Sequence, residues 1–358
     1  MKIQWRLVVA TLGVCTHQAM AQSSVTLYGS LGSSVQYVNN EHGKSLVFMS
    51  AGTTPEWVGI TGTEDLGDGL KAIFKLENGI NTQTGAGLVA ADAFSRQAYV
   101  GLLSDKYGKV TAGRQFDITN DLLMPISNGY QTVVYQLYHP LNLDDLGSTF
   151  YNNAVKYTSP SMLGVTFEAM YGFDDTTTQP GRYAGTGVNY SSGPIKISAV
   201  YTTEHDRTLA LGGSLGLTNF LGQTLTSTST FLARSVTTAA IGAMYSVTKD
   251  WSVRSMYSEV SVQGFSGNST TMRTVEAGTN YQTSPFNVVA TGAYYSAFAG
   301  GRYVAATVSD VYYLSKRTQL FAMIAGQQSR NVPAAMALLA PSSNTRQITA
   351  AAGVQLFF

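Results

Sequence analysis

Apolar and polar residues alternate along most of this chain, in segments of about ten residues. In the segment that starts at Leu70, every second residue up to Leu76 is apolar, whereas Lys71, Lys75 and Glu77 lie on the opposite face of the expected strand. Successive side chains of a β-strand point to opposite faces, so each such segment predicts a strand with one apolar and one polar face. The last residues alternate in the same way up to Phe358. The pattern therefore predicts an all-β protein.

The connections between these segments are alternately very short polar turns and longer stretches rich in Gly, Asn, Ser and Thr. Residues 65–69 and 104–108 are short turns, and residues 39–44 and 79–91 are longer connections. This alternation is typical of a transmembrane antiparallel β-barrel, whose short turns face the periplasm. Strands of a soluble sandwich also alternate, but the number of repeats favours the membrane barrel. No linker interrupts the series, so we expect one barrel domain, residues 22–358.

The N-terminal segment, residues 1–21, is predicted to be a signal peptide. Lys2 and Arg6 precede a short apolar run, residues 7–14, and Ala19-Met20-Ala21 matches the small-residue cleavage pattern. Export is therefore expected. No later stretch reaches the roughly 18 to 20 apolar residues that a membrane-spanning helix requires.

Composition supports the same class of protein. Charged residues make up 12% of the chain, about half the usual share in a soluble domain, whereas the 36 Gly and 21 Tyr residues are abundant. Tyrosines near segment ends are typical of the interfacial girdles of membrane barrels. The 22 basic residues balance the 21 acidic ones, which argues against a nucleic-acid partner.

One connection, residues 117–152, is far longer than its neighbours. It contains two prolines, several leucines and the aromatic residues Tyr130, Tyr135 and Tyr138. Loops of this length are usually functional or disordered, and the apolar and aromatic content argues against disorder. We expect this third outward connection to fold into the barrel lumen and to set its narrowest cross-section. The alternative is that it packs over the rim of the barrel.

Six segments spread over the chain carry a resemblance to a known family: QSSVTLYG (22–29), GTEDLGDGLKAIF (62–74), SRQAYVG (95–101), GKVTAGRQ (108–115), NNAVKYTSP (152–160) and LSKRT (314–318). Together they resemble the Gram-negative general porins of the β-proteobacterial type. The resemblance implies a homotrimer of 16-stranded barrels in the lipid of the outer membrane, each with the third outward loop folded into the pore as an eyelet. It also implies passive diffusion of small hydrophilic solutes and ions through a water-filled channel, without a cofactor.

The number of strands has two possible values. Five regions between residues 183 and 325 each resemble a hairpin, and this count gives 18 strands. Both 16 and 18 are even, as a barrel with both chain ends in the periplasm requires. We favour 16, with 18 as the alternative, because residues 223–234 are rich in Thr and Ser and weakly patterned.

Eyelets of this family place basic residues of the barrel wall opposite acids of the infolded loop, and the resulting field sorts solutes by charge. Arg96 occupies the matching position, and we assign it to the lumen face together with Ala98, with Gln97 and Tyr99 on the other face. By the same alternation of faces, the side chain of Lys156 is also expected to point into the lumen. The predicted basic wall is Arg96, Lys71, Lys75 and Lys156, and the predicted acids of the loop are Asp117, Asp121, Asp144 and Asp145.

The chain departs from the family pattern at two positions. Glu56-Trp57-Val-Gly59 stands where the family usually carries Arg in Ser-Arg-Trp-Gly, and Phe150 stands where Arg commonly precedes the Asn-Asn-Ala-Val-Lys segment. Two basic groups of the pore wall are therefore missing. We expect the anion preference common in these relatives to be weakened, towards neutrality or mild cation selectivity.

Arg114 shares parity with Val110 and Ala112, so we expect it to point away from the lumen. A charged group facing lipid at mid-depth costs about 2 to 4 kcal/mol. We therefore predict that Arg114 lies at the trimer interface, near Asp92 of a neighbouring subunit. The alternative is that its side chain extends to the outer rim.

The sequence gives weaker support to three other functions. An enzyme would need a clustered nucleophile, base and acid, but His42, His139 and His205 lie in no catalytic motif, and no metal-ligand spacing is present. A substrate-selective channel for sugars or organic acids is the main alternative, because the loop tyrosines could stack on such solutes. A structural anchor or adhesin has no need of a long infolded loop.

Overall fold

The computed structural model describes residues 24–358, except residues 90, 148 and 176–180. The predicted signal peptide, residues 1–21, lies outside the described residues. The strands are β1 (Ser24–Glu41), β2 (Lys44–Ser50), β3 (Trp57–Gly67), β4 (Leu70–Gly79), β5 (Gln97–Ser104), β6 (Gly108–Phe116), β7 (Phe150–Thr158), β8 (Val165–Gly172), β9 (Tyr183–Ser192), β10 (Ile195–Leu209), β11 (Asn219–Phe220), β12 (Gln223–Thr224), β13 (Phe231–Ser246), β14 (Trp251–Gln263), β15 (Ser269–Ser284), β16 (Asn287–Phe298), β17 (Gly301–Tyr313), β18 (Thr318–Arg330) and β19 (Arg346–Phe357).

The helices are short: α1 (Ile118–Leu122), η1 (Met124–Ile126), α2 (Asn128–Gln131), η2 (Tyr135–Leu137), η3 (Pro140–Asn142) and α3 (Leu211–Leu215). None of the helices in the described part of the chain is long and apolar enough to cross a membrane.

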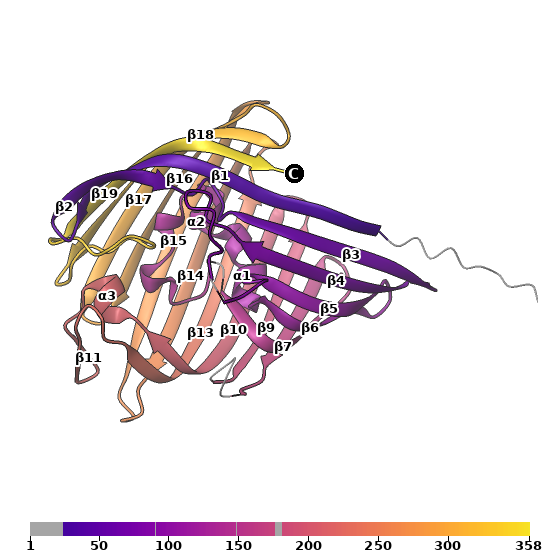
Figure 1. Cartoon of the computed structure of the whole chain (residues 1–358), viewed down its shortest axis with the longest axis horizontal. Helices are drawn as coiled ribbons and strands as arrows, with labels where there is room; N and C mark the ends of the chain where they lie inside the picture. Colours follow the sequence, from indigo (N-terminus) through magenta and orange to yellow (C-terminus); the bar gives the residue numbers. More distant parts are fainter. Residues whose placement is uncertain (1–23, 90, 148, 176–180) are drawn as a thin grey trace, which may run out of the picture.

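The strands form one closed antiparallel barrel (Figure 1). Consecutive strands pair around the ring, and β1 closes it by pairing with β19 from Ser30 opposite Phe357 to Val38 opposite Thr349. Both β2 and β3 pair with β1, so they are two parts of one strand that is interrupted at residues 51–56. Counted in this way the barrel has 16 strands, as predicted.

The count of 18 strands was wrong in one region, residues 209–234. Residues 210–230 connect β10 to β13 and contain α3 and the two-residue strands β11 and β12, which pair only with each other, and residues 231–234 are the first residues of β13. The region therefore contributes no hairpin to the barrel wall. The weak patterning was the correct signal for residues 223–230, whereas residues 231–234 belong to the regular strand β13.

The predicted alternation of faces is present in the strands. Large apolar residues point outward, and more than half of the surface of Val100, Val275 and Val304 is exposed. Along β17, every second residue from Gly301 to Val311 is buried against the inside of the barrel. This outer apolar surface is what a barrel in lipid requires, because the backbone groups are already paired within the sheet.

The long connection between β6 and β7, residues 117–149 (loop 3), lies inside the barrel, where α1 and α2 are drawn in Figure 1. Its helices have local sequence signals, since Asp117 and Ser127 accept hydrogen bonds from the first backbone N–H groups of α1 and α2. Asn128, at the start of α2, donates through its side chain to the carbonyls of Ala277 in β15 and Ala293 in β16. Loop 3 is thus attached to the far wall of the barrel.

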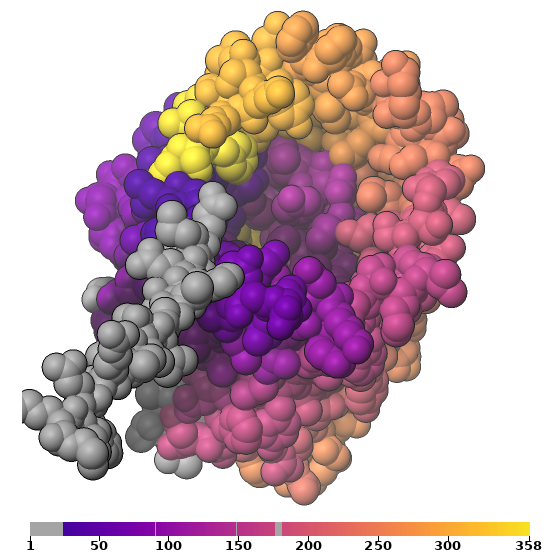
Figure 2. All heavy atoms as spheres, turned by 90° about the vertical axis from the view of Figure 1, so that its right-hand side faces the viewer, coloured from indigo at the N-terminus to yellow at the C-terminus, as the bar shows by residue number. Residues whose placement is uncertain are grey.

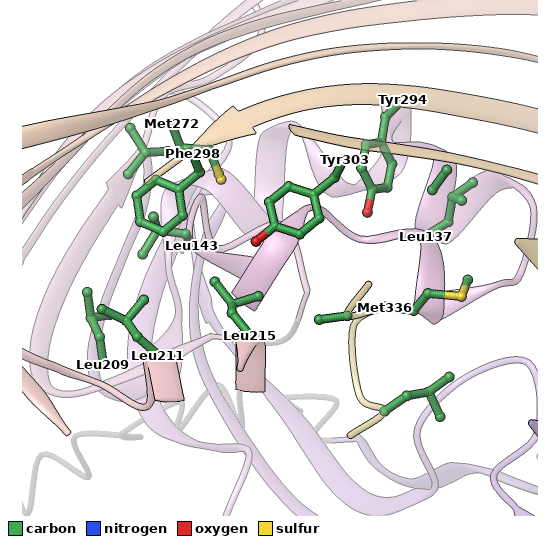
Figure 3. Close-up of a cluster of buried hydrophobic side chains, with 14 of the residues drawn as sticks. Leu137, Leu143, Leu209, Leu211, Leu215, Met272, Tyr294, Phe298, Tyr303 and Met336 are labelled. Carbon is green, nitrogen blue, oxygen red and sulfur yellow. The ribbon is translucent and has the colours of Figure 1, made fainter. Parts of the chain in front are cut away.

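The largest buried apolar cluster of the described chain also lies inside the barrel, on the wall formed by β13–β19 (Figure 3). Two further connections join loop 3 there: residues 210–230 (loop 5) and residues 331–345 (loop 8). The cluster includes Leu137 and Leu143 of loop 3, Leu211 and Leu215 of loop 5, Met336 of loop 8, and Met272, Tyr294, Phe298 and Tyr303 of the strands. We call this cluster the apolar plug. Full burial of one such side chain contributes about 1.5 to 3 kcal/mol.

Candidate functional site

Seen from the end that carries the short turns, the molecule is hollowed at its centre, and purple atoms from the part of the chain that includes loop 3 lie within the ring (Figure 2). Between α1 of loop 3 and the wall formed by β4–β8, the structure has a polar cavity of about 390 Å³. Its charged lining residues are Lys75, Lys109, Lys156, Asp121 and Glu168. We call this space the charged cavity.

Lys156 links the barrel wall to loop 3 at this cavity. It lies on β7 between the outward Val155 and Tyr157, so strand geometry points its side chain inward. Its Nζ donates to the carbonyl of Phe116 at 2.8 Å and forms an ion pair with Asp121 on α1. Lys156 is buried and the side chain of Asp121 is 30% exposed, so the acid presents part of its charge to the cavity.

A second charged group surrounds Glu77 on β4. Its two carboxylate oxygens accept hydrogen bonds from Tyr28 Oη at 2.7 Å and from Gln97 Nε2 at 2.8 Å. Lys75 Nζ lies 3.7 Å away and Arg96 Nε lies 3.6 Å away. Glu77 therefore neutralises part of the basic wall, which reduces the net positive charge beside the lumen.

Arg96 occupies an aromatic environment. Its guanidinium carbon lies 5.7 Å from the centre of the Trp57 ring, 5.4 Å from Phe116 and 5.3 Å from Phe150. Such cation–π contacts hold a guanidinium in place without filling its hydrogen-bond donors. Nε of Arg96 is buried without a hydrogen-bond partner among the described residues.

The assignment of faces around Arg96 was wrong for its neighbours. Gln97 and Tyr99 line the charged cavity, whereas Val100 and Leu102 are exposed on the outer surface. β5 begins only at Gln97, so Arg96 belongs to the connection before it and its side chain does not obey the alternation of the strand.

The structure brings together only some of the predicted residues. Lys75, Lys156 and Asp121 line the charged cavity, but Lys71 is not among its lining residues, and in the strand register it lies opposite Asp65, next to the short turn.

Three of the predicted acids do not face the lumen, which corrects the assignment of Asp117, Asp144 and Asp145 to the pore. Asp117 is fully buried and caps α1. Asp144 is fully buried, accepts a hydrogen bond from Ser258 Oγ at 2.7 Å and contacts His139 Nδ1 at 2.6 Å. Asp145 pairs with Arg207 of β10 at 2.8 Å. These acids fix loop 3 to the barrel, because a buried carboxylate needs charged or hydrogen-bonding partners.

The contact of His139, Asp144 and Ser258 combines the residue types of a hydrolase triad without its geometry. The hydroxyl of Ser258 donates to Asp144 and not to the imidazole, and His139 Nε2 faces Glu276 at 3.4 Å. All three side chains are fully buried. A nucleophile needs a hydrogen bond to its base and access to substrate, so this cluster holds loop 3 and does not catalyse. Within the described ranges, no group of His, Cys, Asp and Glu could hold a metal ion.

Two residues of the charged cavity, Lys109 and Glu168, were missed. The signal was present, because Lys109 precedes the outward Val110 and Glu168 follows the outward Phe167. Glu168 accepts from Thr158 Oγ1 at 3.1 Å, and its other oxygen is buried without a partner among the described residues. The two-residue alternation of side chains along a strand would have assigned both of them to the lumen.

Arg114 lies at a small irregularity of β6, and its neighbours are those of its own chain. Nε and Nη2 donate to the carbonyl of Ser95 at 2.9 and 2.7 Å, and Nη1 donates to Asn152 Oδ1 at 2.6 Å. Asp92 of the same chain is the acid that acts on it electrostatically. The guanidinium thus has partners without a neighbouring subunit, and its place at a trimer interface stays a prediction.

Comparison with known proteins gives consistent matches. A family model described as "Gram-negative porin" matches residues 7–331. The chain is similar to an outer membrane porin protein of Bordetella pertussis, with 29% identity over 54% of this chain and 58% of that protein. It is also similar to outer membrane porin protein 32 of Delftia acidovorans, with 35% identity over 50% of this chain and 54% of that protein. The chain thus spans little more than half the length of the curated relatives it matches.

Two solved structures share the fold. The anion-selective porin from Comamonas acidovorans superposes with a TM-score of 0.77 at 22% identity and covers 94% of this chain and 100% of that one. OmpT of Vibrio cholerae, in a structure described as a trimer form, superposes with a TM-score of 0.66 at 13% identity over 94% of this chain and 99% of that one. The names of all four describe porins or outer membrane proteins and no enzyme.

Proposed function

Since the chain belongs to the Gram-negative porin family, we propose that it forms a water-filled channel in the outer membrane for the passive diffusion of small hydrophilic solutes and ions. The observation that carries this proposal is the position of loop 3, which is bound to the far wall and leaves the charged cavity between α1 and the near wall. Charged groups in a narrow passage between low-dielectric walls act strongly on passing ions. The charged cavity is then the eyelet of the channel.

We expect the ion selectivity of this eyelet to be weak. The cations beside the proposed path are Arg96, Lys75, Lys109 and Lys156, and the anions are Glu77, Asp121 and Glu168. Phe150 stands at a position where the family resemblance implies an arginine, and it stacks on Phe116 with ring centres 4.5 Å apart. The similar Comamonas protein is named anion-selective. For this chain we propose a weaker selectivity than that name states, because nearly equal numbers of positive and negative charges lie beside the path and largely cancel.

The first experiment is the reversal potential of the purified protein in a planar bilayer under a potassium chloride gradient. Conductance with a permeability ratio near one supports both the channel and its weak selectivity. Phe150→Arg should shift the ratio towards anions, and Phe150→Leu is the matched neutral control. A strongly anion-selective wild-type channel would contradict the weak eyelet but keep the channel. An absence of conductance would contradict the proposed function.

We also propose a homotrimer, with contacts on the outside of the β3–β6 wall. A groove of about 580 Å³ lies there, lined by exposed apolar residues that include Val25, Val100 and Leu102. β5, β6, β7 and β8 have only 8 or 9 residues, fewer than most other strands of the barrel. Because these strands are short, the barrel wall is low here. In the proposed trimer, Arg114 and loop 2 (residues 80–96) then lie near the outer rim of a neighbouring subunit. Analytical ultracentrifugation in detergent should give three copies per particle, and a monomer would contradict this proposal.

A further inference from the structure

The outside of the wall β15–β19 carries a line of arginines near the end of the barrel that bears the long loops. In the register of the sheet, Arg302 of β17 lies directly opposite Arg330 of β18. Arg273 of β15 lies in the same line, with Ala297 of β16 between it and Arg302. Arg346, the first residue of β19, lies at the same end, and all four arginines are exposed on the outer face. We call these four arginines the arginine row.

Two members of the row repel each other. Side chains that lie directly opposite on one face of an antiparallel pair have Cβ atoms about 4.5 to 5.5 Å apart, and like charges at this distance are destabilising. Within the described part of the chain, only Arg273 of the row has an acid partner, Glu259 of β14, at 3.0 Å. Arg302 and Arg330 thus face each other without an ion pair to any described residue.

The loops at this end bring no acid to the row. Three connections join β14–β19 there: residues 264–268, 299–300 and 331–345. Their sequences contain neither Asp nor Glu. The second is a tight turn, since Ala299 and Gly300 both have positive φ, +50° and +79°, and it is too short to fold over the arginines. The third reaches into the barrel and joins the apolar plug. The row therefore stays open to the outside.

An apolar band begins next to the arginine row, on the side towards the periplasmic end. One step along the strands, the outward residues are Val275 of β15, Tyr295 of β16 and Val304 of β17. Each of these side chains is about half exposed. Aromatic and apolar residues with charges just beyond them are typical of a membrane–water interface. In the outer membrane, the guanidinium groups then lie at the level of the lipid headgroups of the outer leaflet.

We propose that the arginine row binds the phosphate headgroup of an anionic lipid in the outer leaflet. The phosphate lies between Arg302 and Arg330, and the acyl chains lie along Tyr295 and Val304. A guanidinium binds phosphate through paired hydrogen bonds, so one anion replaces the repulsion of two arginines by two attractions. Clusters of basic residues beside an apolar band attract anionic lipids for the same reason. The row lies outside the β3–β6 wall, so lipid also reaches it in the proposed trimer.

The test compares two lipids with the same acyl chains, phosphatidic acid and phosphatidylcholine. The mature protein in a neutral detergent is titrated with each lipid, and native mass spectrometry gives the concentration at which half of the protein retains a lipid. We expect this concentration to be at least about tenfold lower for phosphatidic acid, which corresponds to 1.4 kcal/mol. Equal concentrations for the two lipids would overturn the site. Displacement of phosphatidic acid by inorganic phosphate at the same concentration would show a site for a free anion and would also overturn it.

The double variant Arg302→Gln and Arg330→Gln should raise the concentration for phosphatidic acid about tenfold and leave that for phosphatidylcholine unchanged. The matched control is Lys316→Gln with Arg317→Gln, which removes two exposed charges from the turn at the other end of β17 and β18. Equal weakening by the two double variants would show a general attraction between charges and would overturn the proposal. The row lies outside the lumen, so both variants should keep the wild-type conductance, which reports that they are folded and tests the channel separately.

The repulsion has its own measurement. In detergent without lipid, Arg330→Gln should raise the unfolding temperature or leave it unchanged, because it removes one of two like charges. Phosphatidic acid should raise the unfolding temperature of the wild type more than that of Arg330→Gln. A lower unfolding temperature of Arg330→Gln without lipid would mean that Arg330 stabilises the barrel by itself and would overturn the argument for a bound anion.

Discussion

The inward faces of β3–β8 and of β13–β18 belong to one barrel, but their residues serve opposite purposes. The first wall presents Lys75, Lys109, Lys156 and Glu168 to the charged cavity. The second presents Met272, Phe298, Tyr303 and other apolar residues to the apolar plug. The difference shows that an inward position is polar where it lines the charged cavity or anchors loop 3, as Ser258 and Glu276 do, and apolar where it packs into the apolar plug. Where loops 3, 5 and 8 cover the wall, the inside of the barrel is a protein core, and the charged cavity, which we propose as the water path, lies off centre beside β4–β8.

The contacts that hold loop 3 differ in the same way. On the far side, buried partners fix it: His139, Asp144 and Ser258, and the pair of Asp145 and Arg207. On the near side, one ion pair between Lys156 and Asp121 bridges it to the wall, and Asp121 remains partly exposed. We therefore expect changes on the far side to alter stability and changes on the near side to alter the passage of ions.

The largest effect is expected for Asp144→Ala. Removal of this carboxylate leaves Ser258 buried without its acceptor and His139 with only the more distant Glu276, and breaking a buried pair costs about 3 to 5 kcal/mol. The free energy of unfolding, measured in urea with the protein refolded in vesicles, should fall by this amount, and loop 3 should loosen, so that single-channel current becomes noisier. Ser258→Ala removes one hydrogen bond and should cost only about 1 kcal/mol. Equal losses in the two variants would contradict the role of Asp144 as the anchor.

Leu137→Ala tests the apolar plug itself. Leu137 of loop 3 is fully buried, and replacement of such a leucine by alanine costs about 2 to 5 kcal/mol through lost burial and the cavity left behind. The same urea titration measures it. Leu163→Ala is the matched control, and its almost fully exposed side chain should leave the free energy of unfolding unchanged. A small effect of Leu137→Ala would mean that loops 3, 5 and 8 rest loosely on the wall.

The far-side anchor should also depend on pH. Burial by itself would lower the pKa of His139, but the carboxylates of Asp144 and Glu276 outweigh it and raise the pKa to about 10. Since this lies above the value of 6.5 for a free histidine, its stabilisation is full below about pH 6.5 and is lost as the pH rises through about 10. Unfolding temperatures measured between pH 6 and 11 should fall over that window. His139→Gln should flatten this part of the profile, and an unchanged profile would contradict a charged His139.

The smallest effect on stability is expected for Asp121→Asn on the near wall. A partly exposed ion pair contributes within about 1 kcal/mol, so the urea titration should change little. Loss of the acid leaves the charge of Lys156 without its ion-pair partner, although the hydrogen bond to the carbonyl of Phe116 remains, and the reversal potential should shift towards anions. Asp68→Asn, in a short turn at the barrel end, is the control and should leave the reversal potential unchanged. A large loss of stability with unchanged selectivity would place Asp121 with the anchoring acids.

Much of the pattern on the near wall could be predicted from the sequence. Alternation around Lys75 and Lys156 assigned both to the lumen, and the same rule applied to Lys109 and Glu168 would have found the rest of the charged cavity. Arg96 could not be placed in this way, because it lies just outside its strand. The acids of loop 3 could not be sorted either, since a loop has no fixed period that separates Asp121 from Asp144.

The sequence by itself determined the class of the barrel, its closing strand and the faces of its strands, because a period of two residues specifies which side chains point inward. It did not determine what each inward side chain meets. The apolar plug, the buried anchors of loop 3 and the charged cavity arise where residues far apart in the sequence come together, as His139 meets Glu276 and Leu137 joins Met336 in the apolar plug. Only the tertiary structure decides these contacts, because the side chain opposite an inward position is set by the path of the loops and not by the pattern of the strand.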